Sequence, residues 1–178
     1  MESLRARVEA KGKEFAARIL AGEGGLTVAR ARAAWFDEAV SELWKPSASN
    51  PLSLVAVGSW GRGTLALGSD LDLRIVTLGT GDRAEAERIV DGLLYPLWDS
   101  GAAIGHQVFS VEEGVQNLAE DFALRTALLD ARLIRGSEEP LARLRAREQS
   151  AQRLISDLET EARGRHERFG GTVYLLEP

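Results

Sequence analysis

The stretch Leu54-Val55-Ala56-Val57-Gly58-Ser59-Trp60-Gly61-Arg62-Gly63, followed closely by Ser69-Asp70-Leu71-Asp72-Leu73, decides how this chain folds. The apolar run at its start predicts a buried strand, and the glycines that follow predict a sharp turn. A second strand is expected over 70–76, carrying two aspartates one residue apart. Because successive strand side chains point to opposite faces, Asp70 and Asp72 are expected on one face of it.

The aspartate pair predicts a metal site. Two carboxylates on one strand face lie about 6–7 Å apart along the backbone, and in a cleft they cannot both stay ionised without a compensating cation. Hard oxygen ligands favour Mg²⁺, or alternatively Mn²⁺, over zinc. We therefore predict that Asp70 and Asp72 are catalytic metal ligands.

The glycine-rich turn predicts phosphate binding. Gly58 permits a positive φ and a close approach of the backbone, and the hydroxyl of Ser59 adds a hydrogen-bond donor. A helix that begins near Trp60 would direct its positive end toward an anion. Combined with the aspartate pair, these features indicate metal-assisted transfer from a nucleoside triphosphate. A hairpin with a polar turn and an acidic edge is the alternative, and it leaves the clustered glycines unexplained.

Three other polar residues accompany this motif. Arg62 is predicted to clamp the triphosphate through a bidentate contact, with an ion pair to a nearby acid as the alternative. Ser69 is a further candidate for nucleotide binding, although capping of the turn before the second strand is the simpler role. His106 could position an acceptor or act as a base, or could be a core histidine.

The motif as a whole resembles the polymerase-β-like nucleotidyltransferases. Their signature is an apolar strand, Gly-Gly or Gly-Ser, a spacer of about ten residues, and Asp-x-Asp; here Gly58-Ser59 and Asp70-Leu71-Asp72 match it. The resemblance implies an α+β fold in which helices pack on a small mixed sheet, followed by a helical subdomain.

Further blocks narrow the resemblance to the nucleotidyltransferase domain of the bifunctional PII uridylyltransferase/uridylyl-removing enzymes. The blocks are Gly58 to Gly63, Tyr95 to Asp99, Gly105-His106, Thr126 to Ile134, and Arg165 to Pro178. The family implies transfer of UMP from UTP to a tyrosine hydroxyl of the PII nitrogen-signalling protein. UTP, or another nucleoside triphosphate, and PII are therefore the expected partners.

Two departures from the pattern affect the expected chemistry. The family usually has Gly-Gly where this chain has Gly58-Ser59, a change that the wider superfamily accepts. The segment 103–109, where many superfamily members carry a third carboxylate, contains no acid. Candidates to replace it lie in helical contexts that favour a cap or a surface pair: Asp99, Asp121 and Asp130. Adenylyl transfer to a protein or small molecule, and a non-catalytic nucleotide-sensing module, remain the alternatives to uridylyl transfer.

The end of the chain predicts further domains in a longer protein. The sequence stops at Glu177-Pro178, where members of the resembled family continue into domains for uridylyl removal and glutamine sensing. The removing domain is named for a His-Asp metal pair, whereas His106 and His166 are here followed by Gln107 and Glu167. We therefore expect no uridylyl-removing activity in this chain.

Composition favours a cytoplasmic enzyme domain. The 178 residues carry 22 basic and 27 acidic side chains, a net charge of −5, so no nucleic-acid partner is expected. Cysteine is absent, which excludes disulfides and thiolate chemistry in this sequence. Its first residues lack the apolar block of a signal peptide, and no apolar run approaches membrane-spanning length.

The periodicity predicts three regions. Residues 1–50 should form N-terminal helices, 51–110 the nucleotidyltransferase core with strands near 52–57, 70–76 and 103–109, and 111–178 a helical subdomain with an extended C-terminal segment. Capping boxes are expected at Asp82/Glu85 and Ser110/Glu113. In the last region, one helix-rich segment should include Leu133 and Ile134 and end at Gly136, and one long charged helix should begin at Pro140.

Overall fold

The computed structural model describes residues 3–45, 51–79, 83–147, 151–168 and 170. They divide into two compact units, residues 1–146 and residues 147–178. The helices of the first unit are α1 (Leu4–Leu20), α2 (Gly25–Leu43), α3 (Gly58–Gly61), α4 (Arg83–Asp99), α5 (Val111–Asn117), α6 (Phe122–Asp130) and α7 (Glu139–Arg145). Its strands are β1 (Leu52–Ala56), β2 (Leu71–Thr77), β3 (Ile104–Ser110) and β4 (Arg132–Gly136), and the second unit contains α8 (Ala151–Arg168).

The strands form one mixed sheet in the order β3-β2-β1-β4. Strand β1 pairs antiparallel with both β2 and β4, whereas β2 and β3 run parallel. Helix α4 makes the crossover between β2 and β3, as a parallel pair requires. The fold is therefore the α+β class with a small mixed sheet and packed helices that the sequence predicts.

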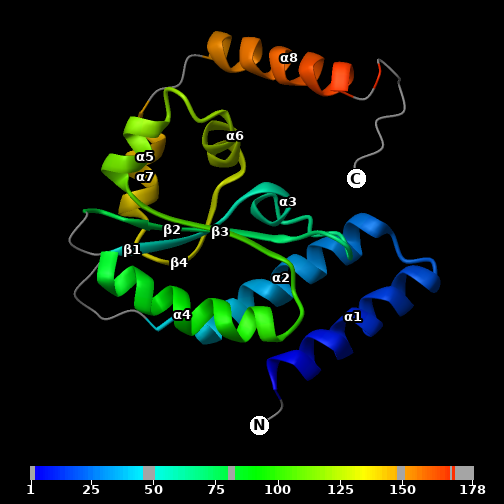
Figure 1. Cartoon of the computed structure of the whole chain (residues 1–178). Coiled ribbons are helices and arrows are strands. Elements are labelled where there is room, and N and C mark those ends of the chain that lie inside the picture. The colour runs from blue at the N-terminus through cyan, green and yellow to red at the C-terminus, as the bar shows by residue number, and fades with distance from the viewer. Residues whose placement is uncertain (1–2, 46–50, 80–82, 148–150, 169, 171–178) are drawn as a thin grey trace. The chain divides into compact units, whose positions relative to one another are not determined.

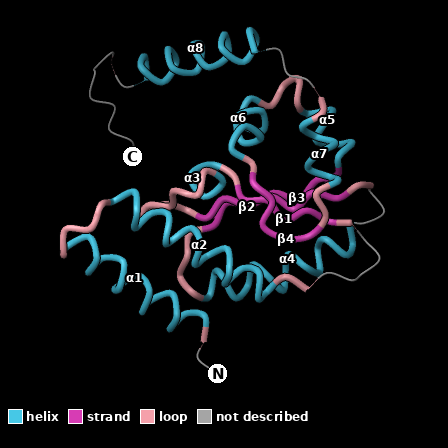
Figure 2. Tube along the Cα trace, turned by 180° about the vertical axis from the view of Figure 1, so that it is seen from behind, coloured by secondary structure: helices cyan, strands magenta, loops and turns pink. Residues whose placement is uncertain are grey.

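Each face of the sheet is covered by a different set of helices. Figures 1 and 2 show α2 and α4 on one face, and α5, α6 and α7 on the other. Alternation along β2 sends Leu71, Leu73 and Ile75 into the core with α2 and α4, while Val76 joins the core with α6 and α7. Asp72 has the same parity as Val76, so it is on the face that α6 covers.

Most of the elements expected in the first two-thirds of the chain are confirmed. The three predicted strands lie within one or two residues of β1, β2 and β3. The capping box at the start of α5 is also confirmed, because Ser110 and Glu113 exchange side-chain to backbone hydrogen bonds. The other predicted capping box involves Asp82, which lies outside the described residues.

The helical prediction for residues around Leu133 and Ile134 is wrong, since they belong to strand β4. Leu133 packs against the core on the α6 side, and Ile134 packs against the core on the α2 side. Two adjacent apolar side chains on opposite faces fit a strand of period two rather than a helix. Pairing with β1, a tertiary contact, decides the conformation here.

The single long helix expected from Pro140 is also wrong. Helix α7 ends at Arg145 and α8 begins at Ala151. Leu141 and Leu144 are buried in the core of the first unit, whereas none of the described residues of α8 is buried. Two segments with such different burial are not one continuous amphipathic face.

No helix in the described parts of the chain has the length and apolar character needed to cross a membrane.

Candidate active site

A pocket of about 330 Å³ opens at the motif that the sequence singles out. It lies on the α6 face of the sheet, between α3, β2 and α6. Of the predicted site residues, Gly58, Arg62 and Asp72 line it. Arg74, Thr126 and Asp130 line it as well. The pocket therefore brings the glycine turn and the second aspartate together.

The carboxylate of Asp72 lies between two glycines that belong to different elements. A Cβ atom added to Gly58 would lie 3.4 Å from Oδ2 of Asp72, and one added to Gly105 would lie 2.3 Å from Oδ1. The parallel register of β2 and β3 places Gly105 directly beside Asp72. Any larger residue at position 105 would occupy the space of the carboxylate, so the two glycines form its cradle.

The charge on Asp72 is poorly compensated. Its carboxylate makes no hydrogen bond within the described chain, and burial raises its pKa above 3.8. The positive charge of Arg74 opposes this rise, and the negative charge of Asp70 adds to it. Asp70 is exposed, immediately precedes β2 and is not among the residues that line the pocket.

The residues present fit a Mg²⁺ ion. The carboxylate of Asp72 in the pocket, with Asp70 two residues before it in the chain, offers the hard oxygen donors that Mg²⁺ prefers. The cradle leaves the oxygens of Asp72 without protein partners, so they are open to a cation. Among the described residues no group of three or more acids or histidines gathers in a metal-binding arrangement, so protein ligands would supply only part of an octahedral shell.

The glycine turn is short and is tied directly to β2. Gly58 has a φ of +60°, in the left-handed region that side chains other than that of glycine rarely adopt. The N–H of Val57 donates to the carbonyl of Asp72 at 3.0 Å, which fixes the entry to the turn against the aspartate strand. Ser59 is partly buried, and its hydroxyl makes no hydrogen bond within the described chain. That donor is thus free for a ligand.

A polar network of Asp37, Trp60 and Arg132 holds α3 in place. The indole Nε1 of Trp60, which is fully buried, donates to Asp37 of α2 at 2.8 Å. Arg132 of β4 makes a bidentate pair with the same carboxylate at 2.8 and 3.1 Å, and also donates to the carbonyls of Trp60 and Gly61. Sequence reasoning missed Asp37 and Arg132, because each acts on the turn from a distant part of the chain.

Arg62 forms an ion pair with Asp130, at the end of α6. This contact is the alternative that the sequence left open beside the triphosphate clamp. A Cβ on Gly61 would come within 2.1 Å of the carbonyl oxygen of Asp130, so glycine is needed there for α3 and α6 to approach each other. Asp130 is thus the candidate third carboxylate that lines the pocket, with its charge already paired.

The other candidates lie elsewhere. Asp121 caps α6 by accepting a hydrogen bond from the N–H of Leu124 at 2.8 Å, and Asp99 is exposed at the end of α4. His106 pairs in register with Leu73, on the face opposite Asp72, and packs edge-on against Trp98. Ser69 closes the turn before β2 with an N–H to the carbonyl of Ala66 at 3.0 Å.

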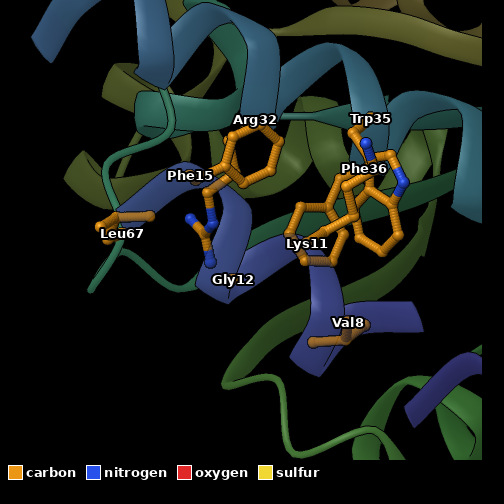
Figure 3. Close-up of a pocket in the computed structure, with 8 residues that line it drawn as sticks. All are labelled: Val8, Lys11, Gly12, Phe15, Arg32, Trp35, Phe36 and Leu67. Atoms are coloured by element: carbon orange, nitrogen blue, oxygen red, sulfur yellow. The ribbon is translucent and has the colours of Figure 1, made fainter. Parts of the chain in front are cut away.

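A second pocket, of about 240 Å³, lies between α1, α2 and the turn that contains Leu67 (Figure 3). Three aromatic side chains, Phe15, Trp35 and Phe36, are among the residues that line it. None of the predicted site residues lines it. Arg32 connects it to the turn before β2, because its guanidinium donates to the carbonyls of Ala66 and Ser69.

The fold and the pocket together define an α+β domain in which a glycine turn and Asp72 line the same pocket. Comparison with known proteins identifies relatives for it. The chain is 34% identical to the bifunctional uridylyltransferase/uridylyl-removing enzyme of Phenylobacterium zucineum, over 90% of this chain and 19% of that enzyme. It is 36% identical to the enzyme of the same name from Rhodopseudomonas palustris, over 75% of this chain and 15% of that enzyme.

These matches confirm the resemblance that the sequence motifs predict: the chain is similar to a part of the bifunctional uridylyltransferase/uridylyl-removing enzymes. It spans less than a fifth of the length of either relative. A solved structure named as a nucleotidyltransferase of Sulfolobus solfataricus covers 66% of this chain and 92% of its own, with a TM-score of 0.37 and 21% identity. No protein-family profile matches the chain.

Proposed function

We propose that this chain is a Mg²⁺-dependent nucleotidyltransferase domain that transfers UMP from UTP to a tyrosine hydroxyl of a PII signalling protein. The observation that carries the proposal is the position of the Asp72 carboxylate, which lies between Gly58 of the glycine turn and Gly105 of β3. That arrangement holds a carboxylate that makes no hydrogen bond within the described chain beside a backbone turn suited to phosphates. The similarity to uridylyltransferases supports the choice of UTP.

Each part of the site has a role in this reaction. The acceptor oxygen attacks the α-phosphorus, the bond from that phosphorus to the bridging oxygen breaks, pyrophosphate leaves, and the hydroxyl proton passes to solvent. Gly58 and Ser59 position the β- and γ-phosphates through the backbone N–H groups at the start of α3 and the free hydroxyl. Asp70 and Asp72 would hold Mg²⁺, which would neutralise charge on the triphosphate.

Recognition of a protein acceptor requires more surface than this pocket offers. A specific interface between folded proteins buries about 800 Å² on each partner, whereas a tyrosine presented to a pocket of about 330 Å³ contacts only part of that area. We therefore propose that the isolated chain binds PII weakly. We further propose that it does not remove UMP from modified PII, because neither His106 nor His166 is followed by an aspartate.

Thermal-shift titration with each of the four common nucleoside triphosphates, with and without Mg²⁺, tests the nucleotide. UTP with Mg²⁺ should give the largest rise in melting temperature, because a ligand that binds only the folded state stabilises it. A larger shift with ATP would redirect the proposal to adenylyl transfer. No shift with any triphosphate would refute it.

The acceptor is tested by mixing the chain with PII, Mg²⁺ and UTP labelled on the α-phosphate. Label on PII that appears only at high PII concentration fits the proposal. Efficient labelling at low micromolar PII would show that this chain alone recognises the acceptor. Binding and turnover without any label on PII would reject the acceptor but keep the nucleotide.

A further inference from the structure

The pocket contains a second arginine, Arg74, whose donors the protein leaves largely unused. Arg74 lies two residues after Asp72 on β2 and on the same face, so both side chains line the pocket. Its Nη1 donates to the carbonyl of Leu73 at 2.9 Å, and within the described residues that is its one hydrogen bond. A guanidinium has five N–H donors. Four are therefore without protein partners, including Nε, which is buried.

The other arginines around the site are already engaged. Arg62 is paired with Asp130, and Arg132 makes a bidentate pair with Asp37. Arg74 has no such salt bridge to any described acid, although Asp72 and Asp121 both attract it electrostatically. Burial lowers its pKa, so the fold holds this cation partly away from water. Buried donors in proteins normally have a hydrogen-bond partner. For the buried Nε of Arg74, a ligand bound in the pocket would supply that partner.

Charge and position indicate which ligand Arg74 would meet. The planar fork of an arginine matches two oxygens of a phosphate group. Gly58, at the start of α3, lines the same pocket and lies next to the carboxylate of Asp72. A phosphate chain that extends from the glycine turn across Asp72 would therefore come within reach of Arg74.

We infer that Arg74, rather than the Arg62 that the sequence suggests, is the arginine that binds a phosphate group of the nucleotide. The inference rests on the proposed function, because it takes the ligand of the pocket to be a nucleoside triphosphate. It adds a specificity for the phosphate chain that does not depend on the base.

The experiment measures the affinity of the full chain for UTP and for tripolyphosphate, both with Mg²⁺, by isothermal titration calorimetry. The variant Arg74→Leu should bind both ligands about 10- to 100-fold more weakly, as expected for loss of a hydrogen-bonded charge. Arg74→Lys should fall between it and the unmodified chain, because an ammonium retains the charge but not the fork. The matched control is Arg135→Leu, which removes the same charge from an exposed position on the edge strand β4.

The outcomes separate the inference from the function on which it rests. Equal affinities of Arg74→Leu and the unmodified chain, with UTP still bound, would overturn the role of Arg74 and leave the nucleotidyltransferase proposal standing. If Arg74→Leu weakened the binding of UTP but not of tripolyphosphate, Arg74 would contact the base or the sugar, and its proposed role in phosphate binding would also be overturned. If the unmodified chain binds no triphosphate, the proposed function fails and the inference fails with it. Should Arg74→Leu not fold, Arg74→Lys decides: an unchanged affinity would overturn the inference.

Discussion

Replacing Gly105 by alanine tests whether the position of the Asp72 carboxylate matters. The added Cβ would lie 2.3 Å from Oδ1 of Asp72, and real contacts of this kind essentially never fall below 3.0 Å. The carboxylate must therefore move by about 0.7 Å or more. A displacement of about 1 Å in a reacting group can lower a rate about 100-fold. We expect Gly105→Ala to lower kcat for UTP-dependent transfer by that order.

The same geometry predicts little loss of stability. The atoms that the new Cβ would approach within 4 Å belong to the Asp72 side chain, which is only partly buried and can rotate. Gly105 does not have a positive φ, so alanine adds no backbone strain. The melting temperature of Gly105→Ala should stay close to that of the unmodified chain.

The matched control is Gly92→Ala, in helix α4, where an added Cβ meets nothing within 4 Å. It should retain full activity and be slightly more stable, because alanine favours a helix over glycine by about 1 kcal/mol. A Gly105→Ala variant that is as active as Gly92→Ala would refute the cradle as the reason for glycine at this position.

Three further predictions follow from the site and its supports. Ser59→Ala should weaken UTP binding by about 1.5–3 kcal/mol, the value of one hydrogen bond to a charged group, and Ser59→Gly should be milder because Gly-Gly is usual in the resembled family; calorimetry measures both. Asp37→Ala should lower the free energy of unfolding by about 1–3 kcal/mol, because it leaves the buried Nε1 of Trp60 unpaired. Urea denaturation measures this loss, with Glu38→Ala as the control at an exposed position. Equal free energies of unfolding for the two variants would contradict the prediction. In a chelator, Asp72→Asn should be more stable to unfolding than the unmodified chain at pH 7, because burial penalises the ionised form of Asp72 in the folded state. The difference in stability should vanish below about pH 3.8, where Asp72 is protonated in both the folded and the unfolded state. A difference that stays the same across this pH range would contradict the penalty for burying the charge.

The sequence predicted best what depends on local pattern. Apolar runs bounded by glycine and proline located β1, β2 and β3, and a Ser-x-x-Glu spacing located the start of α5. The prediction for the aspartate pair holds for Asp72, which lies on β2 and lines the pocket, whereas Asp70 lies just before β2 and is not among the lining residues. These features are set within a few residues and need no knowledge of the rest of the fold.

What the sequence did not predict depends on contacts between distant segments. Strand β4 exists because residues 132–136 pair with β1, about eighty positions earlier. Gly105 matters only because the parallel register of β2 and β3 places it beside Asp72. Arg62 had two possible partners in the sequence, and the choice of Asp130 follows from the packing of α6 on α3. No local signal could have identified these pairs.

The assignment of Asp70 and Asp72 as metal ligands is tested most directly by the rate of nucleotidyl transfer from α-labelled UTP with Mg²⁺ in the unmodified chain, Asp70→Asn and Asp72→Asn. Each substitution removes one charge and keeps the shape of the side chain, so circular dichroism should show an intact fold. Both variants should lose transfer, and so should the unmodified chain in a chelator. Transfer retained in either variant, with Mg²⁺ present, would contradict the assignment of the aspartate pair as the metal ligands.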